Sequence, residues 1–161
     1  MADPLIEAAS DLLDTALRDM REAIAGAPPE RLNDRPAGED TNSIAVLAVH
    51  ALHSTRWWMS VSLGVRRPDR HRPSEFLATT EGGSELLEVF DEIAADCRTV
   101  LQTEAPFDAS AVRDPSGYDE NAPQEEPVTA AWALLHALTH LQEHTAQLQL
   151  TRQFFLANAS A

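Results

Sequence analysis

Three histidines lie at intervals of four in one segment of this chain. They are His136, His140 and His144, within the largely apolar stretch from Ala131 to Phe155. Residues four apart on an α-helix lie on one face with Cβ atoms about 5–6 Å apart, so a neighbouring pair of imidazoles could hold one ion. His136 and His144 would be about 12 Å apart along the axis, too far for one ion to bind all three. A metal site in this chain therefore needs a third ligand from another segment.

His50 and His53 are the candidates for that ligand, because they lie on a second apolar segment with a helical pattern. At about 100° per residue their side chains are about 60° apart around a helix, so only one of them points at a given centre. Imidazole is a common ligand for transition metals in proteins. The alternative is that all these histidines are ordinary polar residues of amphipathic helices, or core residues bonded to carbonyl groups. The presence of His50 and His53 on a second apolar segment favours the metal site over these alternatives.

Apolar residues at steps of three and four predict an all-α chain with four helices and no sheet. The Asp3-Pro4 start signal opens the first helix, which ends near Ala25. The other three helices are expected after a cap at Thr41, Asn42 or Ser43 and up to Gly64, after a cap at Ser84, and from Pro127 to about Phe155. Glu125 and Glu126 place negative charge at the start of the last helix, which the helix dipole favours.

Two long connections, residues 65–83 and 104–126, can cross over a helical bundle, whereas an up-and-down bundle needs only short loops. The first contains Arg66, Arg67 and Arg70, which could form a basic patch for an acidic ligand or a solvated loop. We favour the solvated loop. His71 has no helical partner, so we leave it out of the site.

Length and charge limit the classes of function. The 161 residues suffice for one domain over the whole chain, in which we expect residues 156–161 to be a frayed tail. The net charge of −14 would repel a phosphate backbone, so nucleic acid is not an expected partner. The single cysteine, Cys97, excludes an internal disulfide and is expected to be a small buried residue. Without a membrane span or a basic signal sequence at the start, we expect a cytoplasmic protein.

Two motifs resemble those of the DinB-like (DinB/YfiT-like) superfamily of metalloenzymes. The first runs from Asn42 to His50, NSIAVLAVH, and is followed by Arg56-Trp57-Trp58. The second is HLQEHTAQ, from His140 to Gln147. Members often have Arg-Gly where this chain has Thr145-Ala146, so contacts made there in relatives are not expected here. Related mycothiol-dependent maleylpyruvate isomerases have a glutamate where His140 stands, so this chain is more similar to the three-histidine members.

The resemblance implies a site and a fold. It makes His50, His140 and His144 the metal ligands, with Gln147 as the matching glutamine, and Zn²⁺ or Ni²⁺ as the ion. It implies an up-down-down-up four-helix bundle with a long connection between helices two and three. The long connection between helices three and four is an expectation from the sequence itself. Relatives act as thiol S-transferases or isomerases on small substrates with low-molecular-weight thiols, and are often homodimers.

Several roles stay open from the sequence. His136 could line the pocket, or replace His144 by pairing with His140, and His53 and Trp57 could contribute to the pocket or the surroundings of the ligands. Three hypotheses for function follow: a metal-dependent thiol transferase or isomerase acting on a small electrophile, a metal-dependent hydrolase, and a non-catalytic helical module with structural histidines. We favour the first.

Overall fold

The computed structural model describes residues 3–102, 106–116 and 126–158 of the chain. Its four long helices are α1 (Pro4–Ala25), α2 (Ile44–Leu63), α4 (Gly83–Leu101) and α5 (Ala130–Asn158). The short elements are a 3-10 helix η1 (Pro29–Arg31), helix α3 (Arg72–Glu75) and strands β1 (Val112–Arg113) and β2 (Val128–Thr129). None of the described helices combines the length and the apolar character that crossing a membrane requires. The expectation of a mostly helical chain is confirmed.

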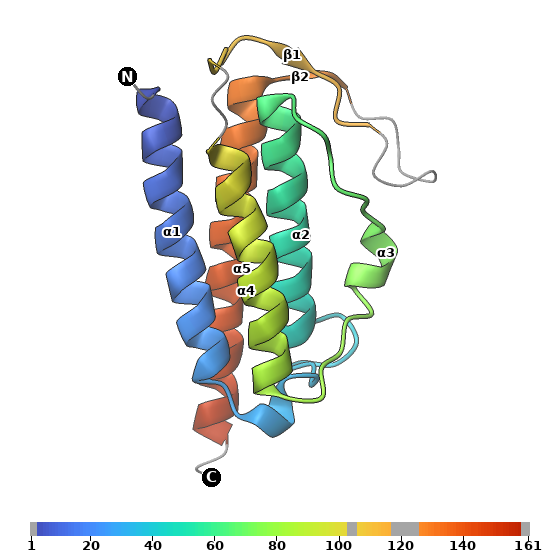
Figure 1. Ribbon diagram of the computed structural model, residues 1–161. Helices are drawn as coiled ribbons and strands as arrows, with labels where there is room; N and C mark the ends of the chain where they lie inside the picture. The colour runs from blue at the N-terminus through green and yellow to red at the C-terminus, as the bar shows by residue number, and fades with distance from the viewer. Residues whose placement is uncertain (1–2, 103–105, 117–125, 159–161) are drawn as a thin grey trace.

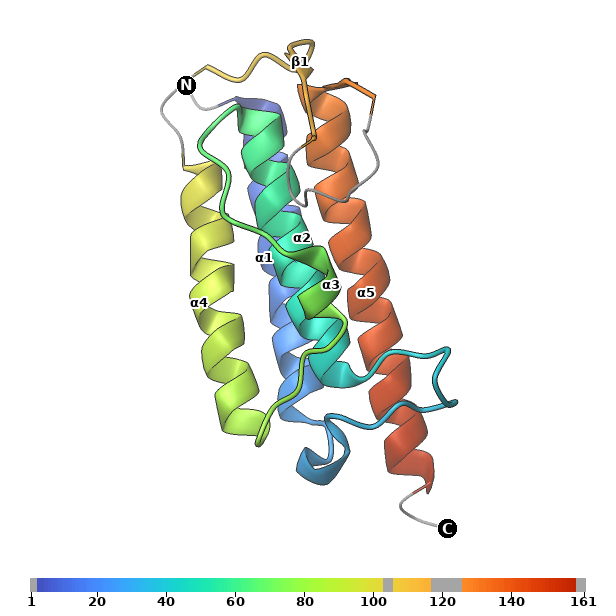
Figure 2. The ribbon, with the colours of Figure 1, turned by 90° about the vertical axis from the view of Figure 1, so that its right-hand side faces the viewer.

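The long helices lie side by side, with α1 and α5 running in one direction and α2 and α4 in the other (Figure 1). Helix α2 packs against both α4 and α5, while the linker of residues 65–82 passes over its outer side and places α3 there (Figure 2). Side chains around the whole of α2 are therefore buried, among them Ile44, Leu52 and Met59, each at most 1 % exposed. The predicted crossover of the first long connection is confirmed, since α2 and α4 run in the same direction and the linker must return along the molecule.

Three predicted helix boundaries are confirmed by their contacts. The Asp3 carboxylate accepts a hydrogen bond from the Leu5 N–H at 2.8 Å, and the Ser43 hydroxyl accepts one from the Val46 N–H at 3.2 Å. Both satisfy donors that have no partner within the first turn of a helix. Gly64 ends α2 with a φ of 65°, a left-handed conformation that favours glycine.

The predicted cap at Ser84 is wrong. Helix α4 begins at Gly83, and the capping position is held by Gly82, which has no side chain to accept a hydrogen bond from the first turn. The carboxylate of Glu85 instead accepts the N–H of Glu81 at 2.6 Å and the hydroxyl of Thr80 at 2.8 Å. The long side chain of Glu85 fixes the preceding turn, so the helix starts two residues earlier than expected.

The prediction that the chain has no sheet is also wrong. Strands β1 and β2 pair in antiparallel register, with Val112 opposite Thr129 and Arg113 opposite Val128. Each strand has two residues, too few to produce an alternating pattern of apolar and polar residues that the sequence could reveal.

The bounds of α5 differ from the predicted ones at both ends. Residues 128–129 form a strand, so the helix begins at Ala130, where the Thr129 hydroxyl accepts the Trp132 N–H at 3.2 Å. Glu125, one of the two acids expected to favour the start, lies outside the described residues. At the other end, residues 156–158, expected to be frayed, are helical.

Cys97 is fully buried in the core, which confirms its expected role as a small buried residue. Burial raises the pKa of its thiol to about 12, because a thiolate would lose its hydration there. The thiolate is the reactive form of cysteine, so the side chain cannot serve as a nucleophile at neutral pH.

Cys97 should therefore resist alkylation in the native protein. We expect a thiol reagent at mildly alkaline pH to modify it only as fast as the protein unfolds, and at once in denaturant. Modification followed by mass spectrometry checks this. Rapid reaction of the native protein would contradict the burial of the thiol.

Leu134 and Leu135 are neighbours on α5 with opposite surroundings, at 0 % and 53 % exposure. Replacing Leu134 by alanine should lower the free energy of unfolding by about 2–5 kcal/mol, because it leaves a cavity in the core. Leu135→Ala is the matched control, with an expected change within about 0.5 kcal/mol. Denaturant unfolding measures both, and similar losses in the two variants would show that α5 is rotated from its described position.

Candidate metal centre

His50 of α2 meets His140 and His144 of α5 where these two helices pack against each other. Among the described residues, the ligand nitrogens of these three imidazoles all lie within 4.8 Å of one another. The Nε2 atoms of His140 and His144 are 3.2 Å apart. His50 is 4 % exposed, and the other two side chains are half-buried. The spacing of four on α5 produces the pair, and the packing of α2 adds the third imidazole.

The carboxylate of Glu75, in the linker between α2 and α4, contacts Nδ1 of His50. Glu75 Oε2 lies 2.7 Å from His50 Nδ1, and the Glu75 side chain is 4 % exposed. Arg70 binds the same carboxylate through Nε at 2.7 Å and Nη2 at 3.0 Å. Burial by itself would raise the pKa of Glu75, but the hydrogen bonds from His50 and Arg70 and the charge of Arg70 outweigh it and lower the pKa to about 2. An ionised carboxylate only accepts, so His50 Nδ1 is the donor.

His144 has a neutral partner on its Nδ1. The Gln147 side chain places Oε1 at 2.9 Å from that nitrogen, one turn further along α5. Since an amide oxygen only accepts hydrogen bonds, Nδ1 of His144 carries the proton and Nε2 carries the lone pair. Gln147, which the family resemblance singled out, therefore orients one of the three imidazoles.

Burial lowers the pKa of both histidines on α5. For His140 the pKa falls to about 3, first because of burial and then because charges on His144 and His50 would repel another charge. For His144 burial lowers the pKa, while the hydrogen bond to Gln147 opposes this effect. Both imidazoles are neutral at neutral pH, which is the form that binds a metal ion.

The donor set fits a divalent ion. Two nitrogens bound at about 2.0–2.1 Å to a tetrahedral zinc lie about 3.3 Å apart, close to the 3.2 Å between the two Nε2 atoms. Because the Nδ1–H groups of His50 and His144 donate hydrogen bonds to Glu75 and Gln147, the Nε2 atoms of these two residues carry the lone pairs. Nδ1 of His140 is buried and has no hydrogen-bond partner in the described part of the chain. That these residues bind a metal stays a prediction.

His136 lies in an aromatic cluster next to the three histidines. Its ring stacks on Trp132 with a centroid distance of 4.8 Å and an interplanar angle of 9°, and Trp58 meets it edge-on at 4.7 Å. In the described ranges, the donor group that could share an ion contains His144 and not His136. The geometry thus favours the pairing of His140 with His144 over the pairing of His136 with His140.

His53 and Trp57 also lie on α2, outside that donor group. His53 is half-buried, and burial lowers its pKa. Trp57 is 3 % exposed, and the guanidinium of Arg67 lies over its ring at 5.4 Å from the centroid. Trp57 is therefore part of the core, and a role for either residue in binding a substrate stays a prediction.

Sequence reasoning missed Glu75 and misjudged Arg70. The Arg70 side chain is only 4 % exposed, so the interpretation of this part of the linker as a solvated loop is wrong. Pro73 and Ser74 before Glu75 are compatible with the short helix α3. No periodic pattern connects such a short helix to His50, because the path of the linker over α2 decides which residue faces it.

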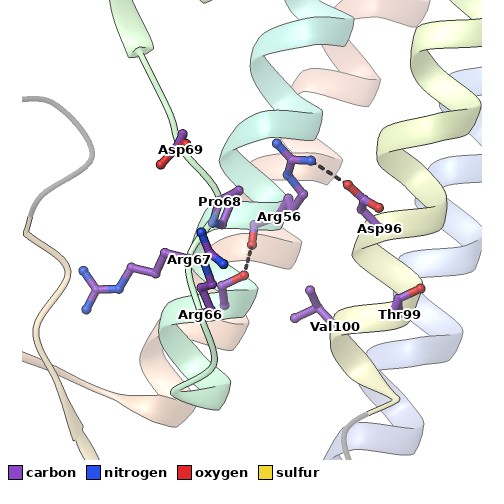
Figure 3. A pocket seen from close by; sticks show the side chains of 9 residues that line it. Arg56, Arg66, Arg67, Pro68, Asp69, Asp96, Thr99 and Val100 are labelled. Carbon is purple, nitrogen blue, oxygen red and sulfur yellow. Dashed lines mark hydrogen bonds and ion pairs between the residues drawn. The ribbon is translucent and has the colours of Figure 1, made fainter.

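Two cavities of about 340 Å³ lie near α2. One is lined by Arg56, Arg66 and Arg67, and its lining includes the 2.6 Å ion pair between Arg56 and Asp96 of α4 (Figure 3). It contains none of the histidines. The other is lined by the loop before α2 and by side chains of α2 and α5. Gln147, which accepts a hydrogen bond from His144, is one of its lining residues.

The chain is similar to a known family in sequence and to a solved structure in fold. The sequence pattern of the family described as the DinB superfamily matches residues 12–148. The crystal structure of a conserved protein from Enterococcus faecalis aligns with a TM-score of 0.72 over 97 % of this chain and 99 % of that chain. The two sequences are 20 % identical, so this likeness concerns the fold alone. No curated protein matches the chain.

Replacing Glu75 by alanine should lower the free energy of unfolding by about 3 kcal/mol, because Arg70 and His50 lose a buried carboxylate partner. Denaturant unfolding in the presence of a chelator measures this without a contribution from bound metal. Asp91→Ala is the matched control, since the Arg21–Asp91 pair has similar bidentate geometry but side chains 48 % and 52 % exposed. Its loss should be much smaller because water screens the pair. Equal losses would contradict the buried position of Glu75.

Proposed function

Because the chain belongs to the DinB superfamily, we propose that it is a four-helix-bundle metalloprotein whose His50, His140 and His144 hold one divalent metal ion. The observation that carries the proposal is the group of three imidazole donors within 4.8 Å of one another. Zn²⁺ or Ni²⁺ suits this set, because both are readily bound by imidazole nitrogen.

The residues around the three histidines support this proposal. When bound, a divalent ion with three protein ligands retains an open position and lowers the pKa of a water or thiol that binds there. Glu75 and Gln147 hold protons on the Nδ1 atoms of His50 and His144, and burial keeps the His140 and His144 imidazoles neutral. His50 and His144 thus present Nε2 lone pairs, rather than protons, toward the centre.

We propose further that the protein transfers a low-molecular-weight thiol to a small electrophile, or isomerises such an electrophile with the thiol as cosubstrate. The resemblance of its two motifs to those of thiol-using relatives supports this reaction. The cavity next to Gln147 adds support, because its volume of about 340 Å³ suits a small molecule. Its lining combines apolar Leu47 and Leu150 with polar Asp40 and Thr41. A homodimer in the cytoplasm is part of the same proposal.

Protein purified without a histidine tag should contain about one divalent ion per chain by elemental analysis. A chelator should lower the melting temperature of the wild type by about 10 °C, because the ion stabilises the folded state that binds it. His50→Ala and His144→Ala should melt at the same temperature with and without the chelator.

His71→Ala is the matched control, because His71 is an exposed histidine of the linker. This variant should respond to the chelator as the wild type does. A wild type that contains no ion and ignores the chelator would overturn the metal proposal and favour a non-catalytic helical module.

Turnover of small electrophiles with and without an added low-molecular-weight thiol tests the reaction. The proposal predicts activity that requires both the metal and the thiol. Metal-dependent activity that needs only water would identify a hydrolase instead.

A further inference from the structure

We propose that Glu75 is a positioning residue of the metal centre, which holds His50 in the tautomer with Nδ1 protonated so that Nε2 is left for the ion. The inference rests on the proposed function and deepens it. Since Glu75 belongs to α3, the linker between α2 and α4 would then be part of the site formed by α2 and α5.

The contacts of Glu75 fix its carboxylate in one orientation. Oε2 accepts from His50 Nδ1 at 2.7 Å and from Arg70 Nη2 at 3.0 Å, while Oε1 accepts from Arg70 Nε at 2.7 Å. A bidentate guanidinium contact adds geometric specificity to an ion pair, because both oxygens are held at once. The side chains of His50 and Glu75 are 6 % and 4 % exposed, so water does not compete for these bonds.

The ring of His50 is held by a second contact from the same segment. Phe76 packs against it with a centroid distance of 4.5 Å and an interplanar angle of 37°, and Arg72 lies over Phe76 at 5.1 Å. Neighbouring residues of the linker thus fix both the plane of the imidazole and the position of its proton. Rotation of the ring would break the hydrogen bond and the aromatic contact together.

Charge distinguishes His50 from the other two histidines. Its Nδ1 donates to a carboxylate, whereas His144 donates to the neutral amide of Gln147, and Nδ1 of His140 has no hydrogen-bond partner among the described residues. A carboxylate behind a histidine makes its other nitrogen a stronger donor to a metal and fixes the ring. Of the three imidazoles, His50 is therefore the one whose ring orientation and tautomer are held most firmly for binding a metal.

The competing interpretation is that Glu75 acts only in stability, as the centre of a buried ion pair that attaches the linker to α2. Both interpretations predict destabilisation when Glu75 is removed. They differ in the tautomer of His50 and in the affinity for metal of a variant that remains folded.

The first test is nitrogen NMR of the histidine side chains in wild-type protein treated with chelator. We expect His50 to carry its proton on Nδ1 and to have an unprotonated Nε2. A proton on Nε2 would overturn the proposal, because that nitrogen would then face the other two histidines as a donor. This measurement needs no bound metal and no variant.

The second test is the affinity for Zn²⁺, measured by competition with a chromophoric chelator. Glu75→Ala should weaken binding about 10- to 100-fold, the usual effect of removing a residue that orients a metal-binding histidine. Glu75→Gln keeps an acceptor oxygen but loses the charge, so we expect a loss of about tenfold. Asp91→Asn, which changes a surface carboxylate paired with Arg21, is the control and should bind Zn²⁺ as the wild type does.

The variants also separate the possible outcomes. If Glu75→Ala fails to fold, the affinity of Glu75→Gln decides. Wild-type affinity in folded Glu75→Gln and Glu75→Ala would reduce Glu75 to a structural role, which overturns this proposal and leaves the metal site intact. A wild type that binds no Zn²⁺ overturns the proposed function itself, and the NMR tautomer then still decides whether Glu75 orients His50.

Discussion

Helix α2 packs against α5 over the largest contact between two elements in the described part of the chain. This contact forms much of the core, and it brings a histidine from the first half of the chain to the histidine pair near the other end. Leu134, Ala137 and Leu141 of α5 are fully buried on the side of the helix that makes this core. The same apolar surface that stabilises the fold thus sets the separation of the three imidazoles.

The linker over α2 has a comparable part in the site. Parallel α2 and α4 require a connection that returns along the molecule, and this one passes over α2 at the level of His50. A buried carboxylate and a buried guanidinium are costly to place away from water unless each is paired. Here Arg70 and Glu75 form a buried ion pair, and the same carboxylate also accepts a hydrogen bond from His50. A topological requirement of the fold therefore places a buried carboxylate beside His50.

Residues with a regular spacing were predictable from the sequence, and residues placed by an irregular path were not. His140, His144 and Gln147 follow from helical geometry and family resemblance, and Asp3, Ser43 and Gly64 follow from the chemistry of helix ends. Glu75 lies in a four-residue helix whose position depends on the whole linker, so no local pattern identifies its partner. The strands β1 and β2 and the start of α4 were missed because they depend on one or two contacts each.

We propose that three imidazoles from two helices bind one ion, and X-ray absorption of the metal-loaded protein can test this. We expect about three nitrogen ligands at about 2.0–2.1 Å, with the outer-shell scattering of imidazole rings and no sulfur from protein. One of those rings should disappear from the spectrum of His50→Ala, because α2 supplies a single ligand. A first shell made of oxygen alone, or a spectrum that His50→Ala leaves unchanged, would show that these three histidines do not bind the ion together.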